Sequence, residues 1–172
     1  MGFYKGDENN RFVLGNKSEK TLFVIGLNPS KANDKQADPT MNRVKEFANQ
    51  NGFDTFIMLN LYPKITSQPS KLPNDIDCDE DLITLNVEVI KDAIPQNATI
   101  LAAWGGNIND HKYLRRSLHL IGKQLEKRNC KWLKIGDTQC GDPKHPNPLF
   151  YKPPIDKFLD FDFKNYFEHL QF

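Results

Sequence analysis

Four short motifs carry the side chains with the clearest chemistry, and each motif directly follows an apolar run. They are Gly26-Leu27-Asn28-Pro29-Ser30, Leu59-Asn60, Trp104-Gly105 and His145-Pro146-Asn147-Pro148-Leu149. Asn60 comes after the run 56–59, so its amide lies at the buried end of a predicted strand and needs hydrogen-bond partners. Because a carboxamide both donates and accepts, it suits the edge of a nucleobase. The alternative is a structural Asn that bonds to neighbouring backbone.

His145 is the only one of the four histidines placed in such a loop. His111 and His119 fall on a predicted helix, and His169 lies in the C-terminal tail. Prolines at positions 143, 146 and 148 stiffen the loop around His145, and rigid placement is what a catalytic or recognition side chain needs. No pair of histidines stands at metal-ligand spacing with a carboxylate, so the sequence predicts no metal site.

The three cysteines predict no cofactor and no covalent framework. Cys78, Cys130 and Cys140 contain no C-x-x-C pair and are odd in number. This pattern argues against a zinc knuckle, a four-cysteine iron–sulfur site and a set of disulfides. We expect reduced thiols in the core or at the surface.

Apolar runs and helical patterns alternate along the chain, and they must position the four motifs. The runs 21–27, 55–61, 98–104 and 131–135 are short enough for buried strands. Between them, helical stripes are formed by Met41, Val44 and Ala48 after the N-cap pair Asp38-Pro39, by Leu82, Leu85 and Val89, and by Leu114, Leu118, Ile121 and Leu125. A further edge strand is expected at Arg11–Leu14.

This alternation predicts an α/β fold of three layers, α/β/α, with a four-stranded and mainly parallel central sheet. Right-handed crossovers put every strand-to-helix loop at the same edge of such a sheet, where ligands bind. We therefore expect the four motifs to converge. The length of 172 residues predicts a single domain over 1–172.

The C-terminal segment 158–172 is rich in aromatic side chains. It contains Phe158, Phe161, Phe163, Tyr166 and Phe167. We expect a short helix that packs back on the domain, and the alternative is a tail that binds a partner.

The charge balance excludes an extended, strongly basic coat for nucleic acid. Lys and Arg total 23 against 22 Asp and Glu, which gives a net charge of +1. Residues 74–100 nevertheless carry one basic and seven acidic groups, and residues 101–152 carry ten and four. A local basic surface around the His145 loop is therefore compatible with the near-neutral total.

No apolar run approaches the roughly 20 residues that span a bilayer, and the N-terminal residues include no apolar signal region. The sequence predicts a cytoplasmic protein that does not bind membranes.

Taken in order, the four motifs resemble those of the uracil-DNA glycosylase superfamily. Its members carry G-Q-D-P-Y or G-I-N-P-G, an L-L-N strand end, an L-W-G strand end and H-P-S-P-L. Along nearly its whole length the chain also resembles a bacterial and phage family of unknown function, number 1643. The matching elements are Leu27–Ser30, Asp38–Arg43, Ala103–Gly105 and His145–Leu149.

The superfamily resemblance implies a role for each motif residue. Asn28 orients the attacking water, Asn60 reads the base, and His145 stabilises negative charge on the departing base. Leu149 fills the gap left by a flipped nucleotide. Gly26, Leu27 and Ser30 line the base pocket, the backbone at Pro29 and Asn147 meets phosphates, and Lys144, Arg115 and Arg116 are further phosphate candidates, with Arg43 and Trp104 as possible additions.

The implied function is hydrolysis of the N-glycosidic bond of a damaged or modified base in DNA, which requires no cofactor. Asn28 replaces the Asp of the most efficient members, and an amide cannot act as a general base. Ser30 replaces a Tyr, so the pocket has room for a pyrimidine substituted at carbon 5. Two alternatives stay open, namely a non-catalytic module that binds a nucleotide or modified base, and a hydrolase of a free nucleoside or nucleotide.

Overall fold

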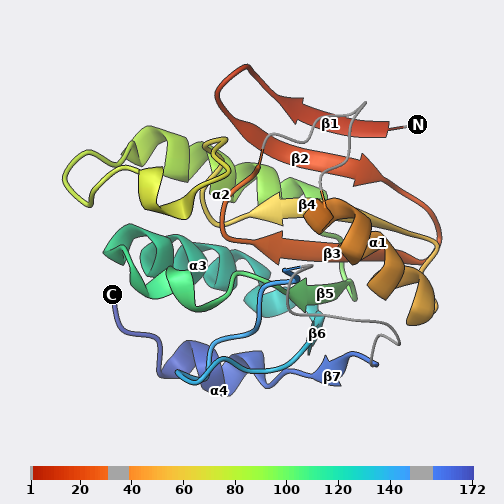
Figure 1. The fold of residues 1–172 in the computed structure, drawn as a ribbon. Coiled ribbons are helices and arrows are strands. Elements are labelled where there is room, and N and C mark those ends of the chain that lie inside the picture. The colour runs from red at the N-terminus through yellow and green to blue at the C-terminus, as the bar shows by residue number, and fades with distance from the viewer. Residues whose placement is uncertain (1, 31–38, 148–156) are drawn as a thin grey trace.

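Four parallel strands form the centre of one sheet in the computed structural model, which describes residues 2–30, 39–147 and 157–172 (Figure 1). They are β3 (Thr21–Gly26), β4 (Thr55–Asn60), β5 (Thr99–Ala102) and β6 (Lys131–Lys134), adjacent in the order β4-β3-β5-β6. Each coincides with a predicted apolar run. The apolar side chains of β3 are buried on both faces, which is why its sequence is continuously hydrophobic.

The sheet is wider than the four strands predicted. Among the described residues it contains seven, because β1 (Gly2–Gly6), β2 (Arg11–Asn16) and β7 (Leu159–Asp160) add antiparallel pairs at its two sides. The mixed α/β class is confirmed, but the four-stranded sheet is wrong. β2 is also not an edge strand, since it lies between β1 and β4. The sequence analysis did not predict β1, because this short strand has no continuous apolar run.

Helices cover both faces of the sheet (Figure 1). The helix α1 (Pro39–Gln50) buries Met41, Val44 and Ala48, as predicted, against Val24 and Met58 on one face. The helices α2 (Glu80–Ala93) and α3 (Lys112–Leu125) pack on the other face. Short 3-10 turns, η1 (Pro69–Lys71), η2 (Gly106–Asn109) and η3 (Glu126–Arg128), complete the connections.

The predicted apolar stripe of α2 is confirmed only in part. Val89 is buried and Leu82 is half-buried against the core, but Leu85 is 47% exposed. The rest of the buried face is formed by Ile83, Asn86, Val87 and Ile90. These residues repeat at i, i+3, i+4 and i+7, which is the ordinary period of a helix that covers a sheet. The sequence analysis did not find this face, because the face includes the polar residue Asn86. The stripe of α3, in contrast, is buried as predicted.

The C-terminal helix α4 (Phe163–Glu168) follows β7 and lies along the β6 side of the sheet (Figure 1). The ring of Phe163 stacks on Trp132 of β6, with centroids 3.8 Å apart. Tyr166 and Phe161 contact the buried Trp104. The aromatic residues of this segment therefore pack on the sheet and on the end of β5.

The observed face of α2 predicts unequal effects for two truncations within one turn of the helix. Ile83→Ala should lower the free energy of unfolding by about 2–5 kcal/mol, because it opens a cavity in the core. Leu85→Ala should change it by less than about 0.5 kcal/mol, because the side chain is largely solvated. Urea unfolding of both variants measures the difference. Equal losses would contradict the helix orientation.

Candidate site at the carboxyl edge of the sheet

The loops that follow β3, β4, β5 and β6 meet at one edge of the sheet. The main-chain N–H of Leu61 donates to the carbonyl of Gly26 over 2.9 Å, which joins the loops after β3 and β4. The N–H of Gly105 donates to the carbonyl of Pro143 over 3.0 Å, which joins the loops after β5 and β6. The parallel strand order therefore brings together the segments that contain the four sequence motifs.

Asn60 is the most unusual residue of this edge. Its side chain is 1% exposed, and within the described part of the chain neither its Nδ2 nor its Oδ1 has a hydrogen-bond partner. By strand alternation it shares a face with Met58, on the side of the sheet that α1 covers. Leaving a buried donor and acceptor unsatisfied costs about 1–3 kcal/mol. Such a cost is typical of a site that is completed by a ligand.

Gly26 makes room for this amide. The residues Gly26 and Asn60 are direct partners in the parallel register of β3 and β4. A Cβ added at Gly26 would lie 2.9 Å from Oδ1 of Asn60 and 2.7 Å from Cε of Met58. A side chain at position 26 would therefore displace the Asn60 amide, so this glycine serves the site through the space it leaves.

Asn28 fastens the loop after β3 to the loop after β4. Its Nδ2 donates to the main-chain carbonyls of Thr66 at 2.8 Å, Pro29 at 3.1 Å and Lys64 at 3.5 Å. The amide donor is thus engaged by the backbone, and the side-chain carbonyl oxygen takes no part in these bonds. Only that oxygen is available for the water-orienting role that the sequence suggested.

The remaining residues of the first motif line the loop in different ways. Leu27 is a buried core residue, so only its backbone faces the loops. The carbonyl of Ser30 accepts a hydrogen bond from Nη1 of Arg11 at 3.3 Å. Arg11, at the start of β2, is 2% exposed and was missed by the sequence analysis. The sequence contains no clear signal for it, because a charged residue at the start of a strand is ordinarily exposed.

His145 lies against Gly105 at the end of the third motif. A Cβ at Gly105 would approach Cβ of His145 to 3.0 Å, and Gly105 has a φ of 73°, in the region that favours glycine. Trp104, in contrast, is 1% exposed and belongs to an aromatic cluster with Trp132, Phe161 and Tyr166. The Trp-Gly motif therefore contributes its glycine to the site and its tryptophan to the core.

The fourth motif is described only through Asn147. The N–H of Asn147 donates to the carbonyl of His145 at 2.8 Å, which turns the chain sharply after the histidine. Lys144 is exposed beside Gly136. Pro148 and Leu149, the expected wedge, lie outside the described residues, as does the expected helix cap Asp38.

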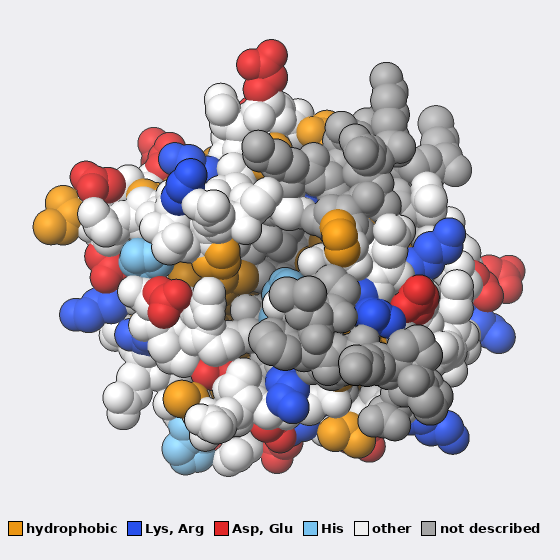
Figure 2. Space-filling view, viewed as in Figure 1, with side chains coloured by type: hydrophobic (Ala, Val, Ile, Leu, Met, Phe, Trp, Pro, Cys, Tyr) orange, Lys and Arg blue, Asp and Glu red, His pale blue; other side chains and the backbone are white. Residues whose placement is uncertain are grey.

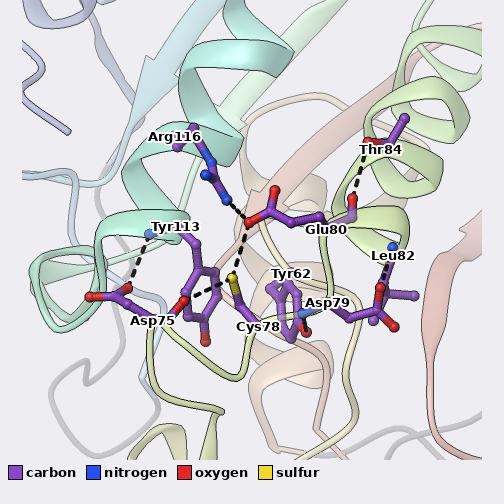
Figure 3. A network of polar contacts seen from close by, with 9 residues as sticks. All are labelled: Tyr62, Asp75, Cys78, Asp79, Glu80, Leu82, Thr84, Tyr113 and Arg116. Carbon is purple, nitrogen blue, oxygen red and sulfur yellow. Dashed lines mark hydrogen bonds and ion pairs between the residues drawn. The ribbon is translucent and has the colours of Figure 1, made fainter.

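Two of the predicted phosphate ligands are engaged within the protein. Nε of Arg115 donates to the carbonyl of Gln171 at 2.5 Å, and its Nη1 donates to the carbonyl of Asn109 at 3.2 Å. Arg116 forms an ion pair with Glu80 at the start of α2, where Cys78 also donates to the same carboxylate (Figure 3). These hydrogen bonds hold the pKa of Glu80 below its usual value. Arg115 and Arg116 thus bind the chain's own carbonyls and carboxylate.

Arg43 is likewise paired, with Glu46 on the next turn of α1 at 2.8 Å. Over the face drawn in Figure 2, the described basic and acidic side chains are interspersed. Among the described residues of the segment 101–152, Arg115 and Arg116 are therefore held by contacts within the protein, while a basic rim around the His145 loop stays a prediction.

Tyr62 and Tyr113 form a second buried polar region near this edge, on the α2 and α3 side of the sheet. Their rings lie 5.0 Å apart, and the Tyr62 hydroxyl accepts a hydrogen bond from the N–H of Asp79 at 3.3 Å (Figure 3). The Tyr113 hydroxyl is buried without a partner among the described residues, and burial raises its pKa. In this respect Tyr113 differs from Tyr166, whose hydroxyl donates to Asp142.

A cavity of about 640 Å³ opens next to the loop after β6. Arg115, Asp142, Phe161 and Tyr166 contribute to its walls, whereas Asn60 and His145 are not among the described residues that line it. The cavity therefore lies beside the candidate site and is separate from the Asn60 amide.

Within the described residues, no three His, Cys, Asp or Glu side chains are grouped so as to hold a metal ion. None of the helices in this part of the chain is long and apolar enough to cross a membrane.

The fold and the edge geometry define a mixed α/β protein with a candidate ligand site where parallel strands end. The chain belongs to the family described as protein of unknown function (DUF1643), whose model matches residues 11–147. No curated protein and no solved structure in the comparisons matches the chain. The resemblance to family 1643 is thus confirmed, and the resemblance to the uracil-DNA glycosylase superfamily stays a prediction. The family match includes Asn60 and His145 but not the C-terminal segment 157–172.

The unsatisfied amide predicts that Asn60→Leu stabilises the protein. Leucine has a similar volume and removes a buried donor and acceptor, so the free energy of unfolding should rise by about 1 kcal/mol and Tm by about 2–4 °C. Asn86→Leu is the matched control, because its buried Nδ2 donates to the carbonyls of Asn60 and Leu61, and only its Oδ1 has no partner among the described residues. That variant should lose about 1–3 kcal/mol. Thermal and urea unfolding measure both changes in the free energy of unfolding. A similar loss of stability in both variants would contradict the conclusion that the Asn60 amide is unsatisfied.

Proposed function

We propose that this protein recognises a nucleobase at the carboxyl edge of its sheet and hydrolyses the N-glycosidic bond of a damaged or modified base in DNA. The observation that carries the proposal is the buried amide of Asn60, which has no hydrogen-bond partner among the residues that the structure describes. An amide presents one donor face and one acceptor, the pattern that pairs with adjacent donor and acceptor atoms on a base edge. Helices on both sheet faces are compatible with the three-layer, uracil-DNA glycosylase-like architecture that this function implies.

The site residues divide the chemistry between them. Asn60 holds the base, and Gly26 leaves the space in which its amide stands. His145 donates a hydrogen bond to the base as negative charge develops on it, which is an electrostatic stabilisation of the leaving group. The side-chain oxygen of Asn28 orients water, and because an amide takes no proton, the reaction is slow or limited to bases that leave easily. The small Ser30 leaves room for a substituent at carbon 5.

A second candidate function is a non-catalytic module that binds a modified base or a nucleotide. It is favoured by the three carbonyls that engage the Asn28 amide, because these bonds suit a structural Asn. The internal contacts of Arg115 and Arg116 also leave fewer groups for a DNA backbone. A free nucleoside or nucleotide as substrate is compatible with the same observation.

A base-release assay tests the proposal directly. Duplex and single-stranded oligonucleotides that carry uracil, mismatched thymine, 5-hydroxymethyluracil or other 5-substituted pyrimidines are incubated with protein and treated with alkali to cut abasic sites. We expect release of at least one 5-substituted base by the wild type. His145→Ala should lower the rate about 100-fold or more with binding retained, whereas Asn60→Leu should lower affinity about tenfold to 100-fold.

Two exposed or peripheral positions provide matched controls, namely Asn49→Leu at the far end of α1 and His111→Ala before α3. Both should behave as wild type. Binding without release, lost in Asn60→Leu, would support the module. Affinity for duplex DNA that falls steeply with salt would favour a DNA substrate, and weak salt dependence with cleavage of free nucleosides would favour the third function. Base binding that survives Asn60→Leu would overturn the proposal.

A further inference from the structure

We infer that the C-terminal segment 157–172 positions the loop that carries His145, and that Tyr166 and Asp142 are the positioning residues. The role of this loop in base release rests on the proposed function, whereas its attachment to α4 does not. The segment lies beyond the residues that the family model matches. Its contacts with the loop after β6 are nevertheless specific.

The segment is first anchored on the sheet by its aromatic side chains. β7 pairs with β6, and Phe163 stacks on Trp132 at 3.8 Å. A Cβ at Gly122 of α3 would lie 2.5 Å from the ring of Phe167, so α3 and α4 approach closely there. These contacts hold the backbone of α4 and present Tyr166 to the loop after β6, which runs beside α4 in Figure 1.

Asp142 then joins three segments through one carboxylate. It is 6% exposed, and Oδ1 accepts from the hydroxyl of Tyr166 at 2.7 Å while Oδ2 accepts from Nδ2 of Asn109 at 2.7 Å. Within the described ranges both of these donors are neutral. Removing either one should lower the stability of this contact, because leaving a buried carboxylate oxygen unsatisfied is costly. The pair Tyr166 and Asn109 therefore connects α4 and the η2 turn to the same point of the loop.

The attachment of Asp142 restrains His145, which lies three residues further along the loop. Asp142 exchanges two hydrogen bonds with Thr138, one from each main-chain N–H, at 2.8 and 3.1 Å. Pro143 accepts from the N–H of Gly105, and Gly105 is the residue against which His145 packs. With prolines at 143 and 146, the chain between Asp142 and His145 has few rotatable backbone angles.

Packing alone does not hold Asp142 in place. The cavity of about 640 Å³ lies on this side of the carboxylate, and both Asp142 and Tyr166 line it. Asp142 has open space to move into when its hydrogen bond to Tyr166 is removed. The Tyr166 hydroxyl also accepts a hydrogen bond from Nε1 of Trp104 at 3.4 Å. The aromatic ring of Tyr166 would still pack on Trp104 without its hydroxyl, so Tyr166→Phe tests the hydrogen bonds of the hydroxyl with the ring packing of α4 retained, and Asp142→Ala removes the bond to Asp142 without deleting the one from Trp104.

The test compares Tyr166→Phe with Tyr113→Phe. Each variant deletes one hydroxyl, from the half-buried Tyr166 or from the buried Tyr113, but only the Tyr166 hydroxyl is bonded to Asp142. In Tyr166→Phe, hydrogen exchange at the amides of Thr138, Asp142 and Lys144 should accelerate about tenfold, and the imidazole NMR signals of His145 should shift. Tyr113→Phe should change neither. Asp142→Ala should reproduce the effects of Tyr166→Phe.

Ile83→Val controls for a general loss of stability, because it weakens the core on α2 without touching α4. It should leave the His145 signals unchanged. If base release occurs, kcat should fall in Tyr166→Phe with little change in KM, because the base contact at Asn60 is intact. The exchange and NMR measurements need no activity, so a failed base-release assay does not affect them. Equal effects of Tyr166→Phe and Tyr113→Phe on the loop would overturn the inference.

Discussion

The parallel pairing of β3 with β4 on one side and β5 on the other is the constraint on which the candidate site depends. Gly26 stands beside Asn60 and Ile25 beside Ala102 because the strands are in this register. The side chains of β3 are buried on both faces, which places this strand in the interior of the sheet. A slip of one residue would place Leu59 beside Gly26 and turn the amide to the opposite face. The same register aligns the strand ends, so that the following loops meet.

Asn60 shows how a residue of a candidate site can lower the stability of the fold. Its neighbours in the sheet are satisfied and apolar, and the amide stands among them without a partner in the described structure. Asn86 is equally buried, yet it donates to two carbonyls and joins α2 to the end of β4. Two buried asparagines in contact thus differ in their donor groups: Nδ2 of Asn86 is bonded and supports the fold, whereas among the described residues both polar atoms of the Asn60 amide and Oδ1 of Asn86 have no partner. Local departures from structural rules of this kind are expected at functional positions.

The charged residues mostly stabilise the molecule's own loops and helix ends. Arg115 joins the η2 turn to the C-terminal residues, Arg116 joins α3 to α2, and Asp142 joins the loop after β6 to α4. Both arginines that the sequence offered as phosphate ligands are thus held by the protein itself. The proposed recognition of a base relies on the shape and hydrogen bonding of the Asn60 site more than on these two side chains.

The sequence by itself determined the α/β class, the four central strands, the helices α1 and α3, and the convergence of four motifs at one edge. These follow from local hydrophobic periodicity and from the handedness of crossovers, which act over short stretches of chain. It could not reveal β1, the correct face of α2, or the internal partners of Arg115 and Arg116. Nor could it distinguish Asn60, whose amide has no hydrogen-bond partner in the described ranges, from Asn28, whose amide donates to three carbonyls. Only the tertiary structure decided these points, because hydrogen-bond partners and burial depend on residues tens of positions apart in the chain.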